Sequence, residues 1–441
     1  MTPPTPAPVD ASGNHREPPW LARIRFGPAL AVALLVGGLI RLLYVSTFLG
    51  LPDPIIGGDG LAYHLESLRL ANGLGYTSAL IDVGAQTAHH PPAWVTVLAG
   101  FSALGLDTIH GHQLLGVALG MLVIVVAATI GRMVFGDLAG AASGALAAVY
   151  PGFWVLDAQI LSEPLALLML GISIIAFYRF SRQTDVRNAI LVGIAVGLTA
   201  LTRPEQVALL VLLAPILLRA RTVSLLRRAL LGLVVVAIVA ALMSPWIIYN
   251  ASRFEQPVLI SSNMGTSLLT GNCSTTFEGE RKGFHDRKCM RLVKTPEGGA
   301  DRSVIDRLHR DAAIAEIRGN LDKLPSTIAA RYGRAFGLYQ TSHTVAEVAA
   351  WHRTPTWPVW AWVISFWVLA LLALPGIVTA LRSGIDILPL AVPVLVMIGV
   401  VAVFFGEPRY HTMADLSFVV FAGFGLVTLA QRLATKGRAQ G

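Results

Sequence analysis

Charged residues are scarce in this chain of 441 residues. They make up 14% of the sequence, while 54% is hydrophobic; a soluble domain usually carries about 25% charged residues. So little charge cannot cover the surface of a water-soluble protein of this size, so that class is excluded. Apolar runs of about 20 residues recur instead, and such runs are typical of transmembrane helices.

Cysteine is almost absent. Cys273 and Cys289 are the two cysteines, and their C-x15-C spacing matches no zinc-binding pattern. Both lie in the same long polar stretch. If that stretch faces an oxidising compartment, a disulfide between them is expected. No cofactor is indicated by the sequence, and the involvement of a divalent metal ion stays open.

Negative charge is in short supply, which leaves a net charge of +8. The positive residues fall at the ends of apolar runs or mix with acids in the long polar stretch. This distribution argues against a nucleic-acid partner and indicates contact with membrane lipids.

The predicted fold class is an all-α polytopic membrane protein with about ten transmembrane helices. The predicted spans are residues 28–50, 110–131, 138–156, 163–179, 188–202, 204–219, 229–249, 357–381, 385–405 and 411–431. Residues 93–107 are apolar but too short to count as a span, and we expect a re-entrant or juxtamembrane helix there. An amphipathic interfacial helix is expected over 60–72, with Leu61, Leu65 and Leu68 on one face.

These spans divide the chain into five predicted parts. The parts are a disordered cytoplasmic tail (1–27), a seven-span catalytic module (28–249) with a first outer loop (51–109), an extracytoplasmic loop region (250–356), three C-terminal spans (357–431) and a cytoplasmic tail (432–441). Lys and Arg in the short loops fall on the side of both termini, which predicts that this side is the cytoplasm. The polar residues singled out below lie on the opposite face.

The first outer loop carries the strongest chemical signal. Asp59 stands among Gly57, Gly58 and Gly60, which let a backbone turn tightly and a substrate approach closely. A carboxylate at the membrane surface can take the proton of an acceptor hydroxyl. The alternative is that Asp59 caps the helix that follows.

Two histidines follow in the same loop. His89 and His90 precede Pro91 and Pro92, and the prolines fix the preceding backbone in an extended form. The imidazoles can then contact a phosphate or relay a proton. The alternative is a helix start with two exposed histidines.

Further charged residues are predicted at the outer ends of spans. Glu163 opens one span, Arg203 lies in a very short outer loop, and Arg409 and Tyr410 open the last span. Ionisable groups at such positions are costly and tend to be functional. Arg409 suits a phosphate ligand; the alternatives are a helix dipole role for Glu163, a Glu205 partner for Arg203 and an interfacial anchor for Arg409.

Three asparagines complete the set of expected substrate-binding residues. Asn250 ends the seventh span, and Asn263 and Asn272 lie in Gly/Ser-rich clusters of the long loop. Their amides can bind sugar hydroxyls, or the clusters can be turns. Arg41, inside the first span, is expected in a buried ion pair.

The order of these motifs resembles the C-type membrane glycosyltransferases, in the branch of the protein-mannosyltransferase-like and lipid A aminoarabinose-transferase-like enzymes. The motifs are Asp59 with Tyr63; His90-Pro91-Pro92; Leu161-Ser162-Glu163; Leu201-Thr202-Arg203-Pro204; Pro245-Trp246 with Asn250; Asn263 with Gly265 and Gly271-Asn272; and Arg409-Tyr410. The resemblance extends over about residues 28–430. Two departures are that Gly60 follows Asp59, where many relatives have a second acid, and that a histidine precedes Pro91, where some have a lysine.

The resemblance implies a membrane enzyme of the cell envelope that moves a sugar from a polyprenyl-phosphate carrier to a lipid, glycan or protein acceptor. The enzyme would lie in the inner (plasma) membrane with its active face extracytoplasmic. By matching positions, Asp59 is the general base, Glu163 orients its surroundings, and Arg409 holds the lipid phosphate, with help from His89, His90 or Arg203. Hexosyl and pentosyl transfer both stay open.

Three other functional classes compete with this reading. One is a structural membrane subunit, which would not need Asp59, Glu163 and Arg409 on the same side. A transporter or flippase for a lipid-linked sugar would place its polar residues at mid-membrane on broken helices, whereas here they gather at one face. An enzyme similar to O-antigen ligases or polymerases also uses outer-face arginines and a large loop, but does not need a carboxylate in the first outer loop.

Overall fold

The computed structural model describes residues 24–47, 57–80, 82–294 and 301–439. Within these ranges the regular secondary structure is helical and no strand is present, which confirms the predicted all-α class. Residues 1–23 of the tail predicted over 1–27 lie outside the described part of the chain.

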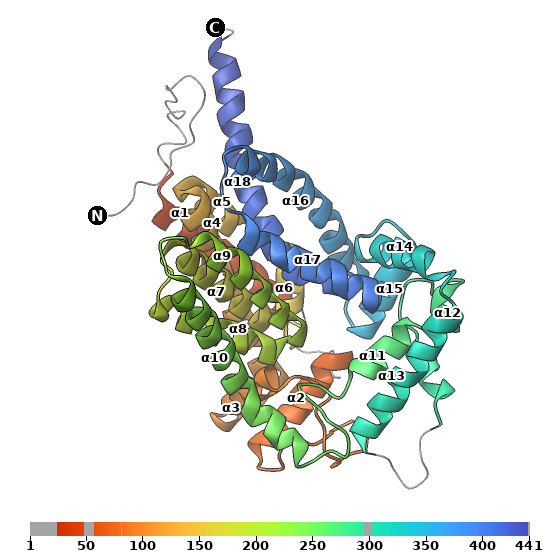
Figure 1. Ribbon diagram of the computed structural model, residues 1–441. Helices are drawn as coiled ribbons and strands as arrows, with labels where there is room; N and C mark the ends of the chain where they lie inside the picture. Colours follow the sequence, from red (N-terminus) through yellow and green to blue (C-terminus); the bar gives the residue numbers. More distant parts are fainter. Residues whose placement is uncertain (1–23, 48–56, 81, 295–300, 440–441) are drawn as a thin grey trace.

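Eleven helical segments form the first half of the fold (Figure 1). They are α1 (Phe26–Ser46), α2 (Gly58–Ala71), α3 (Pro92–Ala103), α4 (Ile109–Phe135), α5 (Asp137–Val149), α6 (Pro151–Asp157), α7 (Glu163–Arg182), α8 (Val186–Thr202), η1 (Pro204–Leu212), α9 (Leu213–Arg219) and α10 (Leu225–Ala251). Side-chain caps fix several starts: Thr108 accepts the Gly111 N–H before α4, and Asp185 accepts the Asn188 N–H before α8.

The long polar stretch is itself mostly helical, which its composition did not indicate. It contains α11 (Met264–Gly271), α12 (Ser274–Phe277), η2 (Arg287–Leu292), α13 (Arg302–Gly319), α14 (Leu324–Ala335) and α15 (Thr341–Trp351). Cys273 and Cys289 are joined by a disulfide, the pairing that the sequence allowed for an oxidising compartment. The chain then returns through α16 (Thr356–Arg382), α17 (Leu388–Val403), η3 (Pro408–His411) and α18 (Thr412–Ala439).

Six helices among the described residues are long and apolar enough to cross a membrane, or seven if the bent pair α5–α6 is one span. The six are α1, α4, α7, α10, α16 and the run Pro408–Thr435 that contains η3 and most of α18. The spans predicted at 188–202 and 385–405 correspond to the shorter helices α8 and α17, and 204–219 divides into η1 and α9. The protein is therefore a multi-pass membrane protein.

Helix α18 lies at the centre of the bundle, where it packs against α16, α5 and α4, while α8 lies between α7 and α10. The predicted buried ion pair of Arg41 is present: its Nε lies 2.6 Å from Oδ2 of Asp157, and both side chains are inaccessible. Helices α1 and α6 are thereby joined inside the bundle, where an unpaired charge would be costly.

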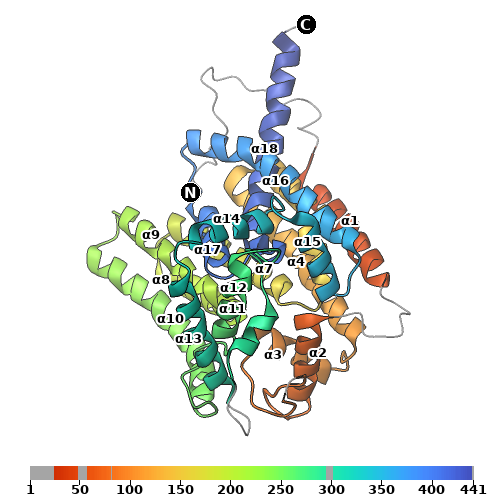
Figure 2. The ribbon, with the colours of Figure 1, turned by 90° about the vertical axis from the view of Figure 1, so that its right-hand side faces the viewer.

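Several short helices gather at one end of the bundle. Figures 1 and 2 show α2, α3, α11 and α13 at the end opposite the C-terminus of α18, and the start of α1 lies toward the α18 end. The helices expected over 60–72 and 93–107 are present as α2 and α3, which pack against each other. This end of the molecule holds the polar residues that the sequence singled out.

Candidate active site

Asp59 lies in the first turn of α2, where a tryptophan confines the backbone. Gly58 has a φ of +54°, and a Cβ on it would lie 2.2 Å from Nε1 of Trp351. A Cβ on Gly57 would lie 2.1 Å from the Trp351 carbonyl oxygen. The glycines before Asp59 are therefore required by a close approach of α15 and a left-handed backbone, both of which exclude other residues.

Four predicted residues from distant parts of the chain form one ion-paired network. Nη1 of Arg409 lies 2.6 Å from Oδ2 of Asp59, and its Nε lies 2.5 Å from Oε1 of Glu163. The same Glu163 oxygen accepts a hydrogen bond from Arg203, 3.2 Å away, and Arg203 also pairs with Glu205 at 2.8 Å. Two guanidinium groups thus face three carboxylates, and the network has no spare positive charge.

This pairing sets the ionisation of Asp59. Burial disfavours the charged carboxylate, but the Arg409 guanidinium outweighs it and holds the pKa of Asp59 well below its usual range. Asp59 is therefore ionised at neutral pH. While Arg409 is bound to it, it is also a weak base, because basicity falls with pKa.

Aromatic stacking positions the predicted histidines. The rings of Tyr63 and His90 stack with centroids 4.0 Å apart, and His89 meets His90 edge-on at 4.6 Å. Burial lowers the pKa of His90 to about 3, so this imidazole is neutral at pH 7. His90 is buried, whereas His89 lines the cavity described next.

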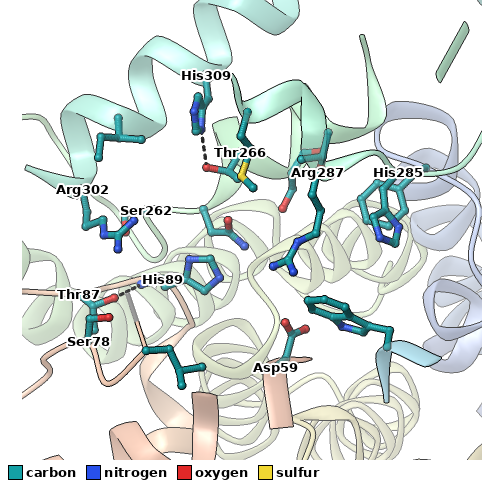
Figure 3. A pocket seen from close by; sticks show the side chains of 18 of the residues that line it. Asp59, Ser78, Thr87, His89, Ser262, Thr266, His285, Arg287, Arg302 and His309 are labelled. Atoms are coloured by element: carbon teal, nitrogen blue, oxygen red, sulfur yellow. Dashed lines mark hydrogen bonds between the residues drawn. The ribbon is translucent and has the colours of Figure 1, made fainter. Parts of the chain in front are cut away.

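A cavity of about 260 Å³ opens beside the network. Of the predicted residues, Asp59, His89, Asn263, Arg409 and Tyr410 line it. Figure 3 shows Asp59 and His89 on one side of the cavity and Thr266, Arg287 and His309 on the other, so α2 and the long loop enclose it together.

Two predicted asparagines lie elsewhere. The Asn250 amide donates to the Val258 carbonyl and accepts from Arg253 at 2.7 Å. The Asn272 amide donates to the Val403 carbonyl and accepts from Arg331 at 2.7 Å. Both side chains are buried, and neither lines the cavity. Their observed contacts hold the long loop against α10 and α17.

Helix α2 turns its polar face toward the protein and leaves the leucine face, predicted to be that of an interfacial helix, partly open. Tyr63, Glu66 and Ser67 are buried, while Leu61 and Leu65 are only partly covered. Glu66 follows Asp59 by seven positions, two helical turns, so both carboxyl groups line the same cavity. Periodicity separated the two faces of α2 correctly but could not tell which of them meets protein.

Two carboxyl groups of the cavity were not identified from the sequence. Burial raises the pKa of Glu66 to about 8 and that of Glu407 to about 7. Among the described residues, neither side chain has a hydrogen-bond or ion-pair partner. Glu407 stands two positions before Arg409. This closeness to a predicted site residue is the sequence feature that could have identified it.

The described part of the chain contains no group of three or more His, Cys, Asp or Glu side chains arranged to hold a metal ion. Asp59, the carboxylate nearest the expected chemistry, is occupied by Arg409. These residues do not fit a divalent metal as they stand.

Comparison with known proteins identifies a related family and fold. Residues 89–249 match the family described as dolichyl-phosphate-mannose-protein mannosyltransferase. No curated protein sequence matches the chain.

Solved structures of oligosaccharyltransferases share the fold at low sequence identity. The apo oligosaccharyltransferase of Archaeoglobus fulgidus has a TM-score of 0.55 at 14% identity, over 96% of this chain and 52% of that one. AglB of the same organism, in complex with an inhibitory peptide and a dolichol-phosphate, has a TM-score of 0.53 at 15% identity, over the same shares of 96% and 52%. ArnT from Cupriavidus metallidurans, bound to undecaprenyl phosphate, has a TM-score of 0.40 at 18% identity, over 91% and 77%.

This chain spans about half the length of the archaeal oligosaccharyltransferases it matches. The family match covers the histidine motif, α7 with Glu163 and the loop with Arg203. Together with the shared fold, it confirms the resemblance predicted from the motifs: the chain is similar to the C-type membrane glycosyltransferases, in the branch of the protein-mannosyltransferase-like enzymes.

Proposed function

We propose that the protein is a membrane glycosyltransferase that moves a sugar from a polyprenyl-phosphate carrier to a lipid, glycan or protein acceptor. The observation that carries the proposal is the network of Asp59, Arg409 and Glu163, which opens into a cavity at one end of a membrane bundle. A carboxylate beside a guanidinium supplies the base and the anion stabiliser that such a transfer needs. Of the similar structures, AglB was solved with a dolichol-phosphate, which is a carrier of this chemical class.

In the proposed reaction, Asp59 accepts the proton of an acceptor nucleophile. The acceptor atom attacks the anomeric carbon of the sugar, and the bond from that carbon to the phosphate oxygen breaks. Its electron pair stays on the oxygen, so polyprenyl phosphate leaves and the sugar configuration inverts. Arg409 faces the negative charge that develops on the leaving phosphate.

The resting ion pair gives this reaction an order. Arg409 holds Asp59 as a weak base before substrate arrives. A phosphate bound at Arg409 would compete for its N–H groups and release Asp59, whose basicity would then rise. Glu163 keeps the Arg409 Nε in place during this exchange, because its own position is fixed by Arg203. We therefore propose that donor binding precedes activation of the acceptor.

The proposed topology has ten crossings, with both termini in the cytoplasm and the cavity outside. Helices α8 and α17 and the segment of η1 with α9 supply the crossings beyond the six long helices and the bent pair. The basic short loops support this orientation, and the disulfide supports an oxidising environment for the long loop.

The test is sugar transfer by the purified protein in lipid, with a panel of polyprenyl-phosphate sugars. Asp59→Asn removes the base with little change of volume, and Asp137→Asn, in an exposed pair with Arg132, is the control. We expect turnover by the wild type and the control and none by Asp59→Asn. Equal turnover by Asp59→Asn would remove Asp59 from the chemistry. If the wild type releases sugar from none of the carriers tested, a transporter or a ligase-like enzyme would be favoured.

A further inference from the structure

Arg287 enters the cavity from the wall opposite Asp59. It is the first residue of η2, in the long loop, and Figure 3 shows its guanidinium directed toward the centre of the cavity, with Asp59 across from it. No sequence motif singled it out, and it takes no part in the network around Arg409.

The other arginines of the cavity and network are matched by carboxylates. Arg409 is shared by Asp59 and Glu163, and Arg302 lies 2.9 Å from Asp82. Among the described residues, Arg287 has no carboxylate at ion-pair distance and its guanidinium donates no hydrogen bond.

The histidines do not add positive charge to the cavity at neutral pH. Burial lowers the pKa of His285 to about 4 and also lowers that of His309. Arg287 is therefore the arginine of the described cavity walls that has no carboxylate at ion-pair distance, although the charge of Asp59 acts on it from across the cavity.

The orientation of Arg287 is fixed without using its N–H donors. Its guanidinium lies over the ring of Trp351, 3.9 Å from the centroid, a cation–π contact that leaves the edges of the fork open. Trp351 in turn packs against Gly57 and Gly58, directly before Asp59. The anion donors of Arg287 and the carboxylate of Asp59 are thus placed relative to each other by one indole ring.

The backbone of η2 is held as firmly. The disulfide from Cys273 ends at Cys289, two positions after Arg287. The preceding residue, Asp286, accepts from the Thr275 hydroxyl at 2.9 Å, and its N–H donates to the Thr270 carbonyl. A short helix fastened on both sides of one arginine presents that side chain with little freedom left to lose on binding.

We propose that Arg287, stacked on Trp351, is an anion-binding residue of the cavity, separate from the Arg409 network, and that it binds a phosphate group of a substrate. The proposal rests on the proposed function for the identity of that substrate. A guanidinium fork binds phosphate through two parallel N–H bonds. The phosphate belongs either to the lipid carrier or to an anionic acceptor.

The test combines binding with kinetics. Undecaprenyl phosphate without sugar is titrated onto the protein in nanodiscs, and KM and kcat are measured for the donor and for acceptors with and without a phosphate. The variants are Arg287→Gln, Arg287→Lys and the control Arg291→Gln, which removes the same charge from the same helix at a position outside the cavity. Gel filtration and thermal unfolding show whether each variant is folded.

If the carrier phosphate is the ligand, Arg287→Gln weakens undecaprenyl phosphate binding and raises the donor KM by about 10- to 100-fold, with a smaller change in kcat. The affinity and donor KM of Arg287→Lys lie between those of the wild type and Arg287→Gln, and those of Arg291→Gln match the wild type. If the acceptor phosphate is the ligand, the rise appears in the KM of the phosphorylated acceptor alone. Either result supports an anion site at Arg287.

Unchanged binding and unchanged KM values in a folded Arg287→Gln protein would overturn the inference, and so would an equal loss in Arg291→Gln. The outcome for the proposed function is read separately. If the wild type transfers no sugar but binds undecaprenyl phosphate, and Arg287→Gln loses this binding, the transferase proposal is refuted and the anion site is supported.

Discussion

Asp59 and Arg409 lie 350 positions apart in the sequence, yet Nη1 of Arg409 donates to Oδ2 of Asp59 at 2.6 Å. The contact joins the start of α2 to the start of the last membrane helix, and the predicted base to the predicted phosphate ligand. In this resting arrangement the Asp59 carboxylate and the Arg409 guanidinium are bound to each other, so neither is available to a substrate. In the mechanism proposed above, Asp59 can act as the base only after Arg409 has bound another anion.

Removal of Arg409 is expected to cost both stability and activity. Arg409→Ala leaves the buried Glu163 and the partly exposed Asp59 without their shared cation, and breaking a buried pair costs about 3–5 kcal/mol. Transfer should fall at least 100-fold, while Arg409→Lys keeps the charge but cannot donate to both carboxylates in the same way. Arg132→Ala, which breaks the exposed pair with Asp137, should cost under about 1 kcal/mol. Thermal unfolding and sugar transfer measure both effects, and an Arg409→Ala protein as stable as Arg132→Ala would contradict the expectation.

The contributions of Glu407 and Glu66 to stability should fall as the pH rises from about 5 to 8. Burial raises the pKa values of Glu407 to about 7 and of Glu66 to about 8, so in this window each carboxyl group binds more protons in the folded protein than in the unfolded chain. Buried histidines such as His90 and His285, with pKa values of about 3 and 4, act in the opposite direction below about pH 6.5, so the two carboxyl groups are tested by comparison with the wild type. Glu407→Gln and Glu66→Gln should each gain stability relative to the wild type as the pH rises, by roughly 1–3 kcal/mol at pH 8. Melting temperatures from pH 5 to 8.5 test this, and a difference from the wild type that does not change with pH would refute the assigned protonation.

Gly58 should not tolerate a side chain. Gly58→Ala combines a positive φ with a Cβ placed 2.2 Å from the Trp351 indole, so we expect a loss of several kcal/mol in stability and of most transfer activity. Gly73→Ala is the matched control, because Gly73 has a φ of +75° and nothing within 4 Å of an added Cβ. The control should lose only the backbone cost of about 1–2 kcal/mol. Equal losses in the two variants would show that contact with Trp351 is unimportant.

Reduction of the disulfide should act through Arg287. The Cys273–Cys289 bridge closes a loop with a sequence separation of 16, so its removal should destabilise the folded loop by about 3 kcal/mol. We expect Cys273→Ser/Cys289→Ser to raise the KM of the phosphate-bearing substrate in the wild-type background. In an Arg287→Gln background the same change should leave that KM unaltered, and in an Arg291→Gln background it should act as in the wild type. If the effects of the cysteine substitutions and of Arg287→Gln on this KM were fully additive, the disulfide would not act through Arg287.

The topology can be tested by labelling with a membrane-impermeant maleimide. Asp322→Cys, exposed between α13 and α14, should react in intact cells. Arg221→Cys, exposed between α9 and α10, should react only after permeabilisation. The reverse pattern would invert the proposed orientation and place the cavity in the cytoplasm.

Much of the fold could be predicted from local signals. Long apolar runs predicted six of the long membrane helices and the bent pair, since length and composition alone decide whether a helix can cross a bilayer. Short or proline-interrupted membrane spans are predicted less accurately from the sequence: the span predicted at 204–219 divides into η1 and α9. The helices of the long loop were missed, although the polar and apolar residues of α13 and α14 repeat with helical periodicity.

The candidate site was predicted where a costly charge stood beside a membrane span. Asp59, Glu163, Arg203 and Arg409 meet in one network because each must find a partner where water is scarce. The asparagines gave no such signal. An amide is satisfied equally well by a substrate or by a backbone carbonyl, and Asn250 and Asn272 bind protein groups.

The sequence by itself determined that this chain is a helical membrane protein with its polar chemistry at one end, because hydrophobicity and charge are local properties. Tertiary structure alone decided which polar groups share a partner. It placed Glu66 in the cavity by turning the polar face of α2 inward, and it left Arg287 without a carboxylate. Pairing energies depend on distances between segments far apart in the chain, and periodicity carries no information about those distances.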